Sequence, residues 1–140
     1  MNPPTADDTW GSTRGSEGHP TAGATPATAS AARDRVADLL LRAGIGLDGV
    51  TAADALLITS ELVTNAIRHG GGITAFHGDI TDDVLHLSVS DTNPRHPVAR
   101  TGTPDHPGGY GWPLIRQLAE HVEIHSHPDG KTITTALRLL

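Results

Sequence analysis

The sequence of this 140-residue chain predicts an α+β fold, a two-layer α/β sandwich in which a mixed, mostly antiparallel sheet carries helices on one face. Apolar residues recur at helical spacing in three segments, and four other segments have the residue pattern of β-strands. The order is helix, helix, strand, strand, loop, helix, strand, strand. Strands and helices therefore segregate more than they alternate, which is typical of an antiparallel sheet with helices on one side.

Two helices are expected in the first half of the chain. The first spans residues 30–43, where Ser30 can accept a hydrogen bond from the first turn. The second spans residues 52–69, where Thr51 followed by Asp54 resembles a capping box with a shorter acid. Glycines end both segments. The expected apolar faces consist of Val36, Leu39 and Leu40 in the first helix and of Leu57, Leu62, Val63, Ala66 and Ile67 in the second.

Two strands follow, over residues 73–80 and 84–90, with a turn at residues 81–83. The apolar residues of the second strand all point to one face. Asp91 is the next alternate residue after these apolar residues, so its carboxylate points towards the core where the strand ends. A buried carboxylate without a partner is costly, so Asp91 needs a protein partner or a ligand that supplies one.

The last third of the chain predicts a loop, a helix and a hairpin. Residues 92–108 hold four prolines and few apolar groups, which indicates a loop. Pro113 suits the first turn of a helix, so the third helix is expected over residues 113–120. Residues 122–127 and 131–139 then form a closing hairpin. The expected buried face of the third helix consists of Leu114, Ile115, Leu118 and Ala119.

The composition narrows the class of protein. Residues 1–28 are rich in small and polar residues and predict a disordered tail, which leaves residues 29–140 as the domain. The tail lacks the pattern of a signal peptide. A net charge of −6 without a basic patch argues against nucleic acid as a partner, and without cysteine no disulfide can form. Because no run approaches the roughly 20 apolar residues that cross a membrane, we expect a soluble cytoplasmic protein.

Three features together indicate a ligand site. Glu61, Asn65 and His69 are spaced i, i+4 and i+8, which stacks their side chains on one helix face. Asp91 points inward at the end of a strand. Residues 108–111 are rich in glycine and open a helix, whose N-terminal N–H groups favour phosphates. A carboxamide oxygen is a hard ligand for Mg²⁺, and a carboxylate near that metal can act as a general base.

Each feature also has a plainer interpretation. The polar residues of the second helix could form an ordinary solvated stripe, and the glycines could form a plain turn. Asp91 could be a turn residue at a strand end. His125 and His127 share one face of a strand, but with no third ligand nearby we interpret them as surface residues and not as metal ligands.

Taken together, these segments resemble the GHKL, or Bergerat-fold, ATPases. Within that group they are similar to the bacterial anti-sigma-factor serine kinases of the RsbW and SpoIIAB type and to their small actinobacterial relatives. The resemblance covers about residues 26–139. It rests on four stretches: Ser60 to His69 (the N box), Val89 to Asp91 (the G1 box), Gly109 to Ile115 (the G2 box) and Gly130 to Ile133 (the closing strand).

The resemblance implies ATP and Mg²⁺ as cofactors. By position, Asn65 would bind Mg²⁺, Glu61 would be the catalytic general base, and Asp91 would read the adenine amino group. The backbones of Gly109 and Gly111 would hold the phosphates. The other residues implied at the nucleotide are Arg68, His69, Asn93, Tyr110, Trp112 and Thr132.

The sequence departs from the family pattern in three places. The G1 box usually continues Asp-x-Gly, whereas Asn93 stands here in the place of the glycine, and asparagine tolerates a left-handed backbone. Trp112 and Pro113 stand where smaller or aliphatic residues are common. The first strand of the family fold would lie near residues 15–25, which lack a strand pattern, so we expect the sheet to be one strand short.

The resemblance implies a protein serine/threonine kinase that phosphorylates an anti-anti-sigma (STAS-domain) partner and sequesters a sigma factor. The alternative is a non-catalytic module whose affinity for a protein partner is gated by ATP, although such a binder would not need Glu61. The catalytic half of a histidine kinase is disfavoured, since we see no dimerisation helix with a phosphoacceptor histidine. An exposed sheet edge would be compatible with a homodimer.

Overall fold

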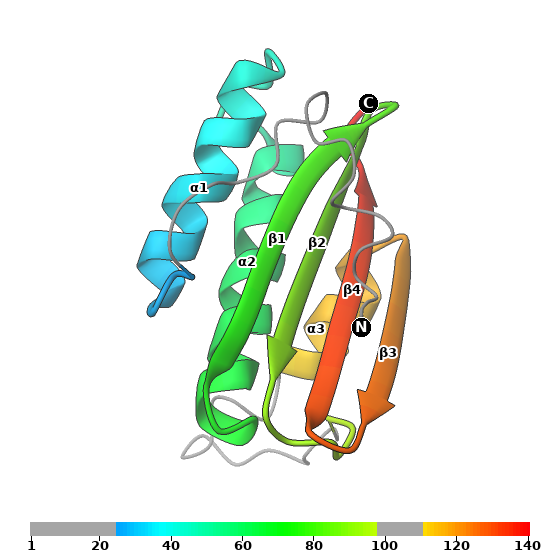
Figure 1. Ribbon diagram of the computed structural model, residues 1–140. Coiled ribbons are helices and arrows are strands. Elements are labelled where there is room, and N and C mark those ends of the chain that lie inside the picture. Colours follow the sequence, from blue (N-terminus) through cyan, green and yellow to red (C-terminus); the bar gives the residue numbers. More distant parts are fainter. Residues whose placement is uncertain (1–24, 98–110) are drawn as a thin grey trace, which may run out of the picture.

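The computed structural model describes residues 25–97 and 111–140. Its elements are α1 (Ala29–Arg42), α2 (Val50–His69), β1 (Ile73–Thr81), β2 (Val84–Asp91), α3 (Gly111–Leu118), β3 (His121–His127) and β4 (Gly130–Arg138). The strands form one sheet in the order β1-β2-β4-β3, and each described pair is antiparallel. Figure 1 shows the described helices on one face of this sheet, which confirms the expected α+β fold.

Helix α2 is the central element of the helical layer. It contacts α1 and α3 and lies against β2 and β1. Leu57 and Ile67, which we expected on its apolar face, are 38% and 44% exposed, whereas Ile58 and Thr59 turn into the core. The buried Thr59 hydroxyl donates to the Ala55 carbonyl oxygen at 2.8 Å, so its burial leaves no unpaired polar group. The largest fully buried apolar side chains are Leu40, Ile58, Leu62, Leu85, Leu87 and Ile115.

By length and composition, α2 is also apolar enough to cross a membrane. This corrects our expectation that no segment of the chain would pass that test. The central helix of a packed protein core meets the same criteria of length and composition, because such a helix is apolar on more than one side. Seven residues of α2 are buried in the described part of the chain, so much of its apolar surface packs on the core.

Helix α1 is capped by Thr28 and not by Ser30 as expected. The Thr28 side-chain oxygen accepts a hydrogen bond from the Ala31 backbone N–H at 3.0 Å. Several hydroxyl residues lie near this helix start, and the local sequence does not say which one adopts the extended backbone of a cap. The tail expected over residues 1–28 lies mostly outside the described residues, but Pro26, near its end, is buried.

Helices α2 and α3 both begin two residues before their expected starts. Gly49 is the N-cap of α2 and no side chain caps the helix, so the expected capping box of Thr51 does not form. Helix α3 begins at Gly111, which places Pro113 third in the helix. Proline is still tolerated there, because the N–H groups of the first turn have no helical partner.

Both hairpins form close to their expected bounds. The β1–β2 turn has Asp82 and Asp83 at its centre, with φ angles of 54° and 62°. Two residues with positive φ are typical of a type I′ turn, which matches the twist of the paired strands. The strand of the family fold near residues 15–25 falls almost wholly outside the described residues.

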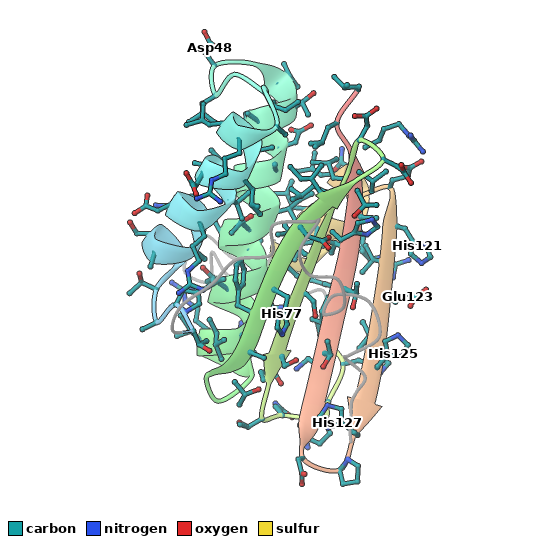
Figure 2. The ribbon with its side chains drawn as sticks, turned by 45° about the horizontal axis from the view of Figure 1, so that its top comes forward. Asp48, His77, His121, Glu123, His125 and His127 are labelled. Atoms are coloured by element: carbon teal, nitrogen blue, oxygen red, sulfur yellow. The ribbon has the colours of Figure 1, made fainter. Side chains whose placement is uncertain are left out.

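The two faces of the sheet differ in chemistry. The face under the helices carries the apolar residues of β2, and Asp91 lies on that same face. The other face is polar, and Figure 2 shows His121, Glu123 and His125 in succession along β3. The helical face therefore holds both the core and the inward carboxylate predicted from the sequence.

Candidate functional site

The polar residues predicted on α2 lie in the second half of that helix. Glu61 and Asn65 are half-buried, whereas Arg68 and His69 are exposed. The buried residues between them hold this part of the helix on the core. Within residues 25–97 and 111–140, the side chains of Glu61 and Asn65 make no hydrogen bond.

Burial raises the pKa of the Glu61 carboxyl above its ordinary value, and the guanidinium of Arg68 counteracts part of that rise. The cause is that a half-buried carboxyl group is less hydrated than an exposed one, which disfavours its ionised form. A general base works best when its pKa lies near the operating pH, so a rise in the pKa of Glu61 suits the role implied by the N box.

Asp91 has protein partners, the first of the two alternatives expected for its inward carboxylate. Its side chain is 4% exposed, and its Oδ2 lies 2.9 Å from Nζ of Lys131, whose side chain is also 4% exposed. Its Oδ1 accepts a hydrogen bond from the Asn93 backbone N–H at 2.9 Å. The carboxylate is thus held by one cation and one turn amide.

The turn formed by residues 91–93 is tied to the end of α2. The backbone N–H and the hydroxyl of Thr92 both donate to the Gly70 carbonyl oxygen, at 3.0 and 2.8 Å. The Asn93 side-chain amide donates to the His69 carbonyl oxygen at 2.7 Å. These bonds satisfy carbonyl groups that a helix end leaves without partners. They place Asp91 beside the helix that carries Glu61 and Asn65.

Asn93 replaces the family glycine in a way that we did not foresee. Asparagine tolerates a left-handed backbone, but among the described non-glycine residues only Asp82 and Asp83 have positive φ, so Asn93 does not adopt one. Its side chain closes the turn instead, through the bond to His69.

Thr132 is not brought together with Asp91. Its hydroxyl lies 2.7 Å from the Ser90 hydroxyl, across the β2–β4 pair. Because neighbouring residues of a strand point to opposite faces, Ser90 and Thr132 lie on the polar face of the sheet while Asp91 lies under the helices. The residue opposite Asp91 is Lys131.

The predicted phosphate-binding segment is described only in part. Gly109 and Tyr110 lie outside the described residues, and Gly111 is the first residue of α3. Trp112, which the resemblance placed at the nucleotide, is 8% exposed and belongs to the hydrophobic core. The guanidinium carbon of Arg116 lies 5.9 Å from the centre of its ring, within the range of a cation–π contact.

The histidines of β3 are surface residues, with Glu123 between two of them. The Nε2 atoms of His121 and His125 lie 2.7 and 3.0 Å from the two carboxylate oxygens of Glu123. These hydrogen bonds lower the pKa of Glu123. Across residues 25–97 and 111–140, no group of three or more histidine, aspartate or glutamate side chains is arranged to hold a metal ion.

Lys131 is the site residue that sequence reasoning missed. It shares the parity of the apolar residues of β4, so its side chain had to point towards the core. A lysine at an inward position next to a hairpin turn is a signal for a buried ion pair, since lysine is almost never buried without a partner.

Comparison with known proteins gives the class of this chain. Residues 22–137 match the histidine kinase-like ATPase domain, so this protein belongs to that family. A similar solved structure is the histidine kinase domain from the Erythrobacter litoralis EL346 blue-light activated histidine kinase. That chain is 19% identical with a TM-score of 0.49, and the alignment covers 84% of this chain and 71% of that one. No curated protein matches.

Proposed function

We propose that this protein binds ATP with Mg²⁺ and phosphorylates a serine or threonine of a protein partner in a transcription-regulatory pathway. The observation that carries the proposal is on α2, where Glu61, with its raised pKa, stands four residues before Asn65. Neither side chain makes a hydrogen bond within the described residues, and the end of the same helix is bonded to the turn that holds Asp91. Family membership supports the ATP-binding part.

The residues present fit both cofactors. The carboxamide oxygen of Asn65 is a hard donor, and Mg²⁺ commonly combines one such protein ligand with phosphate and water oxygens. A site of that kind does not need the cluster of three ligands that the described residues lack. When bound, ATP supplies the phosphoryl group and Mg²⁺ balances the charge that develops on it. The acceptor atoms of Asp91 suit an exocyclic amine of the base.

In this proposal Glu61 accepts the proton of the attacking hydroxyl group. Its raised pKa makes the carboxylate a better proton acceptor than an exposed glutamate. Arg68 opposes the rise and therefore helps to keep Glu61 ionised. Asn65 and Arg68 would position the phosphate end of the ligand.

A non-catalytic, ATP-gated binding module is the second candidate. The hydrogen bonds from Thr92 and Asn93 to the end of α2 favour it, because they couple the turn at the base-reading residue directly to a helix. Nucleotide binding at Asp91 could thus alter a partner surface without any transfer. Under this candidate Glu61 is dispensable.

Calorimetric titration with ATP tests the common part of both candidates. We expect micromolar affinity that requires Mg²⁺ and that GTP does not reproduce. An absence of binding at millimolar ATP would refute both.

Transfer of labelled phosphate from ATP to a STAS-domain protein then separates the two candidates. We expect transfer by the wild-type chain. Glu61→Ala should bind ATP as before but lose about 100-fold or more in rate, the usual contribution of a general base. Transfer that persists at the wild-type rate in Glu61→Ala would rule out the general-base role. Binding of the partner that depends on ATP without transfer would favour the gated module.

The partners in this proposal are an anti-anti-sigma (STAS-domain) protein and a sigma factor. Their recognition would take place in the cytoplasm, where the transcription machinery is found. Co-purification with each partner, with and without ATP, tests this part separately from catalysis.

A further inference from the structure

Lys131 is the single lysine of the chain and has no part in the function proposed above. Its Nζ lies 2.9 Å from Oδ2 of Asp91 and donates to the Asn93 carbonyl oxygen at 3.0 Å. The pair is buried, with 4% of each side chain exposed. Removing one partner of a buried ion pair leaves the other charge uncompensated. Lys131 therefore strongly affects the charge and the hydrogen bonding of the Asp91 carboxylate.

The position of Lys131 is determined by the sheet. Asp91 and Lys131 are register partners in the β2–β4 pair, so both side chains lie on the helical face. The preceding Gly130 lies against the same turn, since a Cβ atom there would collide with the backbone of Asp91 and Thr92. The β3–β4 hairpin therefore closes directly on the residue that the family uses to read the base.

The contacts of Asp91 leave some of its lone-pair positions free to accept hydrogen bonds. An ionised carboxylate has about four lone-pair positions and no donor. Lys131 and the Asn93 N–H each take one of these positions. The remaining positions can only accept, so the carboxylate attracts an amino group of a base and repels a keto oxygen.

We propose that Lys131 is a positioning residue for base selection. By pairing with Asp91 and with the Asn93 carbonyl, it keeps Asp91 a pure acceptor and thereby makes the site selective for a purine with an amino group over one with a keto oxygen at the same position. The inference rests on the proposed function, because it assumes that Asp91 meets the base.

Removing the ammonium group changes what Asp91 can do. A buried carboxylate without a counter-charge takes up a proton or draws in water, because isolated charge is costly in a protein interior. A protonated carboxyl group carries one O–H donor, which can bond to a keto oxygen. A variant without the charge of Lys131 therefore discriminates less between the two kinds of purine.

The test compares ATP with ITP, which differs from adenine nucleotide in carrying a keto oxygen in place of the amino group. Affinities are measured by calorimetry on the wild type, Lys131→Met and Arg138→Met. Arg138 is a matched control, because it is a basic residue at the other end of β4 with 57% of its side chain exposed. The wild type and the control should prefer ATP by about tenfold or more, and Lys131→Met by no more than about threefold.

A double-mutant cycle shows whether Lys131 acts through Asp91. In the Asp91→Asn background, Lys131→Met should have no further effect on the ATP/ITP ratio, since the group that it controls is absent. A further change of the same size as in the wild type would overturn the proposal.

Circular dichroism checks that each variant is folded before titration. If Lys131→Met does not fold, Lys131→Gln, which retains a hydrogen-bond donor without the charge, takes its place. A folded variant with the wild-type ATP/ITP ratio overturns the inference while leaving the proposed function intact. If neither variant folds, Lys131 serves the fold alone and the inference is wrong. A wild type that binds neither nucleotide refutes the proposed function itself.

Discussion

Gly70 packs directly on the carboxyl group of Asp91, so closely that a Cβ atom at residue 70 would collide with that group. Gly70 is the C-cap of α2, and its φ of −104° is open to any residue. The glycine is thus required for close approach and not for its backbone freedom. This contact brings the end of the helix that carries Glu61 and Asn65 against the end of strand β2.

Gly70→Ala is expected to destabilise the protein by about 2 kcal/mol. The added methyl group must displace the Asp91 carboxylate, which is held by Lys131 and Asn93, and such overpacking typically costs about 1–3 kcal/mol. Urea unfolding followed by circular dichroism measures the loss. Gly49→Ala is the control, because a Cβ atom there meets nothing within 4 Å. Equal losses in the two variants would contradict the contact.

Glu61→Gln is expected to change how stability depends on pH. The pKa of Glu61 is raised in the folded state, so the folded state binds the proton more tightly than the unfolded state does. The stabilisation from Glu61 is therefore present at low pH and is lost as the pH rises from its ordinary pKa of 4.5 through the raised value. At pH 7 the variant should be more stable than the wild type, by less than about 1 kcal/mol because solvent screens this half-buried group.

Arg68→Ala provides an internal check on how stability depends on pH through Glu61. Arg68 lowers the pKa of Glu61, so its removal should move the pH-dependent loss of stability to higher pH. Thermal unfolding at a series of pH values measures both effects. Profiles of the wild type and of Glu61→Gln that run parallel would contradict the raised pKa.

Thr28→Ala is expected to cost about 1 kcal/mol of stability, the usual effect of losing an N-cap side chain. The lost bond is the one from the Ala31 backbone N–H to the Thr28 side-chain oxygen. Ser30→Ala should change stability by less than about 0.5 kcal/mol, because Ser30 lies inside the helix and is exposed. A larger loss of stability in Ser30→Ala than in Thr28→Ala would support Ser30 as the N-cap, as predicted from the sequence.

Asn65→Ala is expected to abolish the Mg²⁺-dependent part of ATP binding. The substitution removes the carboxamide oxygen from a half-buried helix position and leaves the helix itself unaffected, since alanine is a good helix former. Calorimetry with ATP, with and without Mg²⁺, measures the difference. Asn65→Asp keeps an oxygen ligand and should retain the metal dependence. An unchanged affinity in Asn65→Ala would remove this residue as the metal ligand.

The sequence by itself determined the elements and the inward direction of Asp91. The spacing of apolar residues along a segment indicates whether it forms a helix or a strand and which of its side chains face the core. This spacing can be read from the segment alone. The same local pattern identified Glu61 and Asn65 on one helix, because a spacing of four residues needs no tertiary contact to be read.

Tertiary structure alone decided what each polar group meets. The hydrogen bond from Asn93 to His69 and the pairing of Lys131 with Asp91 each join groups that lie far apart in the sequence, so the local pattern leaves their relative position open. Thr132 and Lys131 are neighbours in sequence, yet only the register of β4 against β2 shows which of them faces Asp91. The physical reason is that a shift of one residue in register moves every side chain to the other face of the sheet, and the register comes from packing of the whole strand.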